Sequence, residues 1–156
     1  MPKFVKGAKH VYGWFKVGNK GKILIPKEAM KEYNLGDTKK AFLIPSSRRS
    51  GGFGLATKES LEKSPMASVI LAEQPELMEF GGTEGEFVEI NGRPYCWVTI
   101  NKDGSIRIPN ETLKRYGINP GEELLSVKGS HLALGFLSKG PIIEEAKKHN
   151  ALEIFE

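Results

Sequence analysis

The sequence predicts a mainly β fold with short helices, in which one β-β-α-β-β unit occurs twice along the chain. Three observations lead to this prediction: the sequence repeats at a fixed spacing, aliphatic and polar residues alternate in one segment of each copy, and glycine and proline occupy the same places in both copies. A unit of about 45 residues is marginal on a hydrophobic core of its own, so we expect the copies to share one core.

The repeat emerges when the sequence is shifted by 83 residues. The shift superposes these identical pairs: Tyr12 and Tyr95, Trp14 and Trp97, Gly21 and Gly104, Ile23 and Ile106, Ile25 and Ile108, Pro26 and Pro109, Glu28 and Glu111, Lys31 and Lys114, and Tyr33 and Tyr116. The ends of the copies match only loosely, with Phe53, Leu55 and Ala56 over Leu132, Leu134 and Gly135. A run of matches this long is not a chance event and indicates two copies of one structural unit.

Each copy begins with an apolar and aromatic strand, residues 12–17 or 95–100, followed by a polar turn that ends in glycine. A second strand then alternates with a period of two. In the first copy Ile23 and Ile25 share one face, and in the second copy Ile106 and Ile108 do the same. We expect these isoleucines to face the core.

A short helix follows the second strand in each copy. Pro26 and Pro109 suit its first turn, where a missing backbone N–H does not matter, and Gly117 suits the position just past its end. Its buried stripe is predicted to contain Met30 and Tyr33 in one copy, and Leu113 and Tyr116 in the other. Two more strands complete each unit, at residues 40–44 and 54–57 and at residues 123–127 and 132–137.

The predicted organisation has four parts: a first unit at residues 8–57, a helical connection and flexible turn at 58–90, a second unit at 91–138, and a C-terminal helix and tail at 139–156. Prolines interrupt the connection, and Gly81, Gly82 and Gly85 mark its turn. The C-terminal helix is predicted over residues 141–149, since Ile142, Ile143 and Ala146 gather on one side.

Positive charge is concentrated in the first copy. The net charge of the whole chain is +4, but residues 1–46 carry ten Lys and Arg against three Asp and Glu. A basic surface of this kind favours a polyanionic partner, most commonly nucleic acid, although lysines often only solvate a face.

Several function classes are not expected. No apolar run approaches the ~20 residues that a membrane-spanning helix needs, and the basic N-terminus lacks the pattern of a secretory signal, so we expect a cytoplasmic protein without membrane contact. Cys96 lies in an apolar run and is expected to be buried. The histidines are isolated from cysteine and from one another, and no catalytic signature is present, so we expect no metal, no cofactor and no enzyme activity.

The segment from Val17 to Glu28, with Leu35-Gly36-Asp37 downstream, resembles the SpoVT/AbrB domain. The family pattern has a turn glycine, a basic residue, alternating aliphatics, proline, a short helix and an aliphatic-x-x-Gly-Asp/Glu segment. The second copy repeats it from Gly104 to Pro109 and from Ile118 to Glu122. The resemblance implies a swapped-hairpin barrel, here an intramolecular pseudo-dimer, and a transcriptional regulator that binds duplex DNA. It also leaves open a protein-binding module, such as a MazE-like antitoxin with a toxin partner or a self-associating protein, and a degenerate fold that does not bind DNA.

The basic residue after the turn glycine is a DNA contact in the family, and it is kept as Lys22 in the first copy, whereas the second copy has Ser105. Arg48 and Arg49 lie among serines and glycines that suggest the mobile tip of a hairpin. The predicted DNA-binding residues, most of them on the first copy, are Lys16, Lys20, Lys22, Lys27, Lys31, Arg48, Arg49, Lys102, Arg107, Lys114 and Arg115.

Overall fold

A computed structural model describes residues 3–5, 9–128, 130, 132–148 and 152–156, with residues 3–5, 9 and 10 described in backbone only. The first copy forms β2 (Lys9–Lys16), β3 (Lys22–Leu24), α1 (Lys27–Glu32), β4 (Lys40–Pro45) and β5 (Phe53–Ala56). The second copy forms β7 (Arg93–Thr99), β8 (Ser105–Arg107), α5 (Asn110–Arg115), β9 (Glu123–Lys128) and β10 (Leu134–Leu137). The predicted mainly β fold with short helices is therefore confirmed, and each copy follows the β-β-α-β-β order.

The remaining elements precede, connect or follow the two copies. The connection contains α2 (Lys58–Glu62), α3 (Met66–Glu73) and α4 (Pro75–Met78), and the C-terminal region contains α6 (Pro141–Ala146). These helices fall where the sequence predicts helix. Three short strands were not predicted: β1 (Lys3–Val5), β6 (Val88–Ile90) and β11 (Ile154–Phe155).

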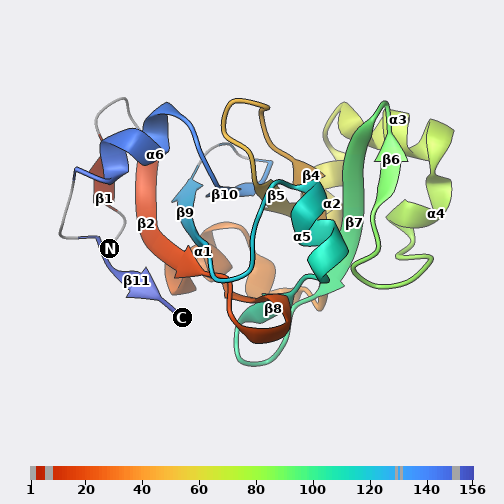
Figure 1. Cartoon of the computed structure of the whole chain (residues 1–156). Coiled ribbons are helices and arrows are strands. Elements are labelled where there is room, and N and C mark those ends of the chain that lie inside the picture. Colours follow the sequence, from red (N-terminus) through yellow and green to blue (C-terminus); the bar gives the residue numbers. More distant parts are fainter. Residues whose placement is uncertain (1–2, 6–8, 129, 131, 149–151) are drawn as a thin grey trace.

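The strands of the two copies are interleaved in the main sheet, whose order is β1-β2-β9-β10-β5-β4-β7-β6 (Figure 1). The first strand of each copy pairs with the third strand of the other copy: β2 with β9, and β7 with β4. The last strands, β5 and β10, pair with each other at the centre, and β11 pairs in parallel with β2. The second strands, β3 and β8, form a separate two-stranded ribbon.

The strand registers obey the same two-fold relation as the sequence repeat. Trp14 lies opposite Leu125, and Trp97 lies opposite Phe42. The shift of 83 residues relates Trp14 to Trp97 and Phe42 to Leu125. Gly54 lies opposite Gly135 in the central pair. Gly54 also pairs with Ile44, and Gly135 pairs with Val127, which is the repeat equivalent of Ile44. The two glycines are therefore equivalent, and the loose match of Ala56 with Gly135 was wrong by two residues.

The expected barrel was also wrong. Among the described residues the main sheet is open, since no ladder joins β1 to β6. The physical reason lies at its edges: β1 and β11 both pair with β2, while β6 pairs with β7, so additional strands occupy the positions through which the sheet would have to close.

One buried cluster draws on both copies. Ile23 and Ile106, opposite each other in the ribbon, pack with Phe53 and Phe136 of the central strands, and all four are fully buried. Helices α2, α3 and α4 cover a second cluster that includes Trp97, and α6 covers a third that includes Ile143. Among the described residues, no helix combines the length and the apolar character needed to cross a membrane.

The helix ends follow the predicted chemistry. Gly117 has a φ of +77° just past α5, and its N–H donates to the Lys114 carbonyl at 2.9 Å, which closes the last turn as predicted. Asn34, the other residue type that tolerates this conformation, has a φ of +55° at the same place after α1. The side chains of His10, His131 and His149 lie outside the described part of the chain, so the expectation about them stays a prediction.

Candidate nucleic-acid interface

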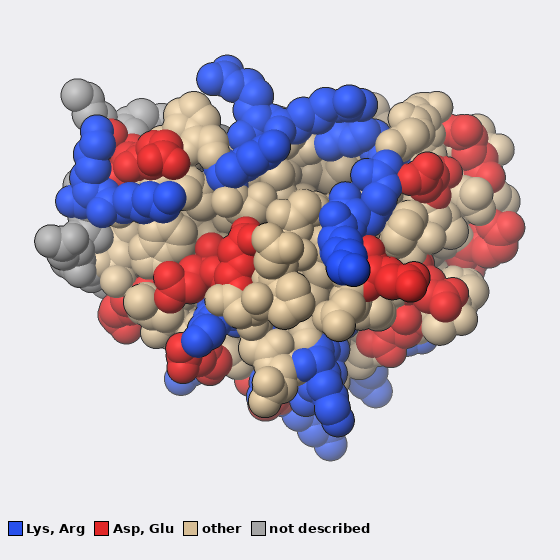
Figure 2. All heavy atoms as spheres, viewed as in Figure 1, with Lys and Arg blue, Asp and Glu red and all other residues tan. Residues whose placement is uncertain are grey.

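The β3–β8 ribbon is where the second strands of both copies meet. Lys22 lies opposite Arg107, and Leu24 lies opposite Ser105. Between these pairs Ile23 and Ile106 point to the other face and are fully buried, as predicted, so the alternation directs Lys22 and Arg107 outward. Figure 1 shows the ribbon at the lower end of the molecule, and Figure 2 shows Lys and Arg side chains gathered over the same end.

Reciprocal hydrogen bonds hold each turn against the other copy. Ile25 donates its N–H to the Gly104 carbonyl at 2.8 Å, and Ile108 donates to the Gly21 carbonyl at 3.0 Å. A Cβ on Gly21 would lie 1.9 Å from the Ile108 oxygen, so this turn approaches the opposite strand too closely for any other residue. The turns consequently fix two exposed lysines, Lys20 and Lys102, at the ends of the ribbon.

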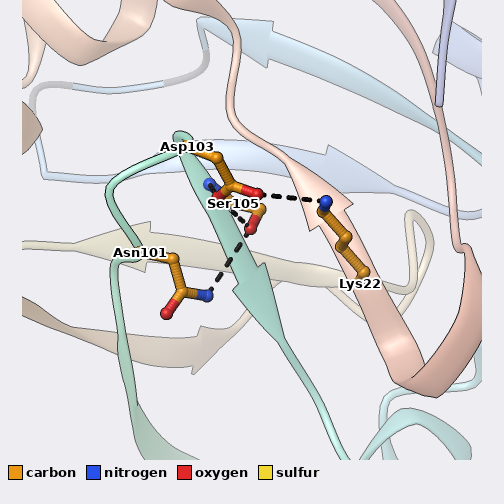
Figure 3. Close-up of polar contacts among 4 residues, drawn as sticks. All are labelled: Lys22, Asn101, Asp103 and Ser105. Atoms are coloured by element: carbon orange, nitrogen blue, oxygen red, sulfur yellow. Dashed lines mark hydrogen bonds and ion pairs between the residues drawn. The ribbon is translucent and has the colours of Figure 1, made fainter.

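An ion pair ties Lys22 to the turn of the second copy (Figure 3). Lys22 Nζ lies 3.0 Å from Asp103 Oδ2, while Asp103 Oδ1 accepts hydrogen bonds from the Ser105 N–H at 3.1 Å and from Ser105 Oγ at 2.5 Å. Asn101 Nδ2 also lies 3.5 Å from Ser105 Oγ. The hydrogen bonds from Ser105, followed by the contact with Lys22, hold the pKa of the Asp103 carboxyl below its usual value.

This network makes the two copies electrostatically different. Under the repeat, Asp103 occupies the place of Lys20, and Ser105 occupies the place of Lys22. The ion pair partly neutralises Lys22, whereas Arg107 is exposed and no acidic partner for it is found among the described residues. Arg107 is therefore the strongest candidate for contact with a polyanion on the ribbon.

Two other residues predicted to bind DNA lie on α1, beside the ribbon, and a third lies at the end of β2. Lys27 begins α1 directly after β3, and Lys31 lies one turn later; both are exposed. Lys16, at the end of β2, lies opposite Glu123 and forms an ion pair with Glu156 at 3.5 Å, so acidic groups surround it. It is the weakest candidate of the first copy.

Four predicted residues belong to another region, near the turn between β4 and β5. Arg48 and Arg49 are exposed on this turn, and Lys114 and Arg115 end α5. Backbone hydrogen bonds join this turn to the second copy. The Ser50 carbonyl accepts from the N–H groups of Ser138 and Lys139, at 3.0 and 2.9 Å, and the Gly52 N–H donates to the Tyr116 carbonyl at 3.2 Å. The turn therefore lies at the tip of the β4–β5 hairpin, as expected, and its C-terminal side packs against the second copy.

Two basic residues near this turn were missed. Arg93 and Lys139 line one cavity together with Arg48 and Arg115. The available signal was their setting, since Arg93 follows Asn91-Gly92 and Lys139 lies in Ser138-Lys139-Gly140, both of which are turn sequences. Their proximity to Arg48 could not be inferred, since it depends on how the two copies pack.

The prediction that Cys96 is buried is confirmed. Cys96 is fully buried, and burial raises the pKa of its thiol to about 12. Trp97 is also part of the core: its side chain is 8% exposed, and its indole N–H donates to the Gly81 carbonyl at 2.9 Å. Neither residue is available to a nucleic acid.

Comparison of the chain with models of known protein families and with curated proteins finds no match. The resemblance to the SpoVT/AbrB domain therefore rests on the residues of the two repeated segments alone.

Proposed function

We propose that the chain is a DNA-binding transcriptional regulator of the AbrB type, which binds duplex DNA with the outer face of the β3–β8 ribbon. The observation on which this rests is the pairing of Lys22 with Arg107 across strands from different copies. A two-stranded antiparallel ribbon has dimensions that fit the DNA major groove, where its outward side chains reach base edges.

The strand exchange supports the same proposal. Reciprocal pairing of β2 with β9 and of β7 with β4 is what an intramolecular swapped-hairpin pseudo-dimer requires. The proposed arrangement keeps the exchanged strands but not the closed barrel. Two-fold related elements present two similar faces to a duplex, whose own backbone has two-fold symmetry.

The basic residues of the ribbon are suited to different contacts with DNA. Lys20, Lys22 and Lys102 act as point charges toward phosphates, and Arg107 can hold a fourth phosphate with two parallel hydrogen bonds, which lysine cannot. Because the second copy has Asp103 and Ser105 where the first has lysines, we expect the duplex to be contacted unequally by the two halves.

Fluorescence anisotropy with a labelled random-sequence duplex at low salt tests this proposal. If four cations contact phosphates, the logarithm of the binding constant should fall with the logarithm of salt concentration with a slope of about −3 to −4, and Arg107→Ala should reduce that slope by about 1. Lys63→Ala is the matched control, since Lys63 is exposed on the connection and pairs only locally with Glu59 among the described residues. No binding by the intact chain, or equal loss in both variants, would refute the proposal.

The protein-binding alternative finds less support. A MazE-like antitoxin uses a tail to wrap its partner, but the described part of the C-terminal region packs on the chain itself: Phe155 stacks on Phe15 with ring centroids 4.7 Å apart, and Ile143 of α6 is buried in a cluster with Val11 and Leu125. A segment occupied in this way is not free to wrap a toxin without first leaving β2.

A further inference from the structure

A cavity of about 390 Å³ lies between the β4–β5 turn, the start of β7 and the end of α5. Four basic side chains line it: Arg48 from the first copy, and Arg93, Arg115 and Lys139 from the second. None of its described lining residues is acidic. Figure 2 shows basic side chains along the upper edge of the molecule, over this turn and beside α5, at the opposite end from the ribbon.

Backbone groups orient two of the arginines. Arg93 donates from Nη2 to the Ser46 carbonyl, and Arg115 donates from Nη2 to the Gly92 carbonyl at 2.7 Å. Arg115 also donates from Nε to Glu89 at 2.8 Å, so one carboxylate outside the lining offsets part of the positive charge. The carbonyl contacts hold the guanidinium groups in place without neutralising them, which leaves an excess of positive charge around the cavity.

The walls of the cavity are also fixed. Gly51 and Gly52 have φ values of +61° and +70°, and a Cβ on Gly52 would lie 1.9 Å from the Phe136 carbonyl oxygen. Tyr116, which also lines the cavity, donates from its buried hydroxyl to the Pro94 carbonyl at 2.9 Å. The cations are therefore brought together by packing between the copies, before any ligand arrives.

The related cavity in the other half has a different charge balance. It is lined by Tyr33, the repeat equivalent of Tyr116, and by five lysines, but also by Glu32, Asp37 and Glu59. Lys128 pairs there with Glu32, and Lys63 pairs with Glu59 at 3.1 Å. Acidic partners thus balance the lysines of one cavity, whereas the cavity around Arg48 lacks them in its described lining.

We propose that the cavity around Arg48, Arg93 and Arg115 binds the phosphate group of a small phosphorylated ligand. Guanidinium groups form two parallel hydrogen bonds with phosphate oxygens, and several cations around one hollow repel one another until an anion enters. The cavity is of the size that holds a small organic molecule, so we assign it to a phosphomonoester in preference to a bare ion. This site is separate from the ribbon and does not depend on DNA binding.

Isothermal titration calorimetry of the full chain with phenyl phosphate, and separately with inorganic phosphate, tests the proposal. We expect phenyl phosphate to bind more tightly than inorganic phosphate, and both Arg48→Gln and Arg93→Gln to weaken it about tenfold or more. Arg49→Gln is the matched control, because Arg49 is exposed on the same turn but does not line the cavity. Arg48 is also exposed, so its replacement is not expected to disturb folding.

Three results would overturn the assignment: no heat with either phosphate, equal weakening by all three variants, or equal affinity for the ester and the bare ion. A labelled duplex is titrated in parallel. If Arg48→Gln weakens duplex binding while neither small phosphate binds or competes, the cavity serves the DNA backbone and the small-ligand proposal is wrong.

Discussion

Lys22 Nζ lies 3.0 Å from Asp103 Oδ2, so a strand of the first copy is joined to a turn of the second by opposite charges. The aspartate takes the place that a lysine has in the first copy. One acidic residue thereby both fastens the ribbon and reduces its positive charge.

Replacing this aspartate by asparagine should therefore strengthen DNA binding. Asp103→Asn removes a negative charge beside the proposed interface and releases Lys22 for phosphates, and we expect an affinity gain of about two- to fivefold at low salt. Anisotropy with the same duplex measures it. Glu59→Gln, which removes an acid of the connection that pairs with Lys63, should leave the affinity unchanged. Equal affinities for the two variants would show that Asp103 does not face the DNA.

The two turn glycines should differ in their tolerance of substitution, although the repeat makes them equivalent. Both have positive φ, +72° at Gly21 and +80° at Gly104, so alanine strains either backbone by about 1–2 kcal/mol. Only at Gly21 does the new Cβ also meet a backbone oxygen, that of Ile108, while no atom lies within 4 Å of a Cβ at Gly104. We expect Gly21→Ala to lower the free energy of unfolding by about 3 kcal/mol or more, roughly twice the loss for Gly104→Ala.

Urea denaturation followed by circular dichroism measures both glycine variants against the unchanged chain. Equal losses would mean that the two turns approach their opposite strands alike, and that the difference between the halves of the ribbon is confined to charge.

The sequence predicts what depends on local pattern and repetition. Alternation placed Ile23 and Ile106 on the core face, and Gly117 marked the end of a helix, because each signal lies within a few residues. The edge strand β6 has three residues and shows no alternation long enough to detect. Its presence, with that of β1 and β11, explains why the sheet stays open.

The neighbours of the basic side chains could not be predicted from the sequence, for a different reason. Lys22 pairs with Asp103, and Arg48 lines the same cavity as Arg93, only because strands of one copy pair in a particular register with strands of the other. A basic composition identified the first copy as cationic, but it could not distinguish a lysine held by an aspartate from an arginine that faces a cavity.

Alkaline pH should destabilise the fold through Cys96. Burial raises the pKa of the thiol to about 12, against which the Tyr116 hydrogen bond acts, whereas a thiol in the unfolded chain titrates near 8.5. Because the folded pKa is the higher one, the stabilisation is complete below pH ~8.5 and is lost as the pH rises toward 12. At pH 10.5 the unfolded thiol is ionised and the folded one is not, which lowers the free energy of unfolding by about 2–3 kcal/mol.

Urea denaturation of the unchanged chain and of Cys96→Ala at pH 8 and pH 10.5 isolates this contribution. The pKa of the buried Tyr116 is raised first by burial and then by Cys96, so Tyr116 destabilises both proteins at high pH and its burial effect is common to them. We expect the variant to lose about 2 kcal/mol less between the two pH values than the unchanged chain does. An identical loss would mean that the thiol ionises as readily in the folded protein as in the unfolded one, and that water reaches Cys96 between β7 and β4.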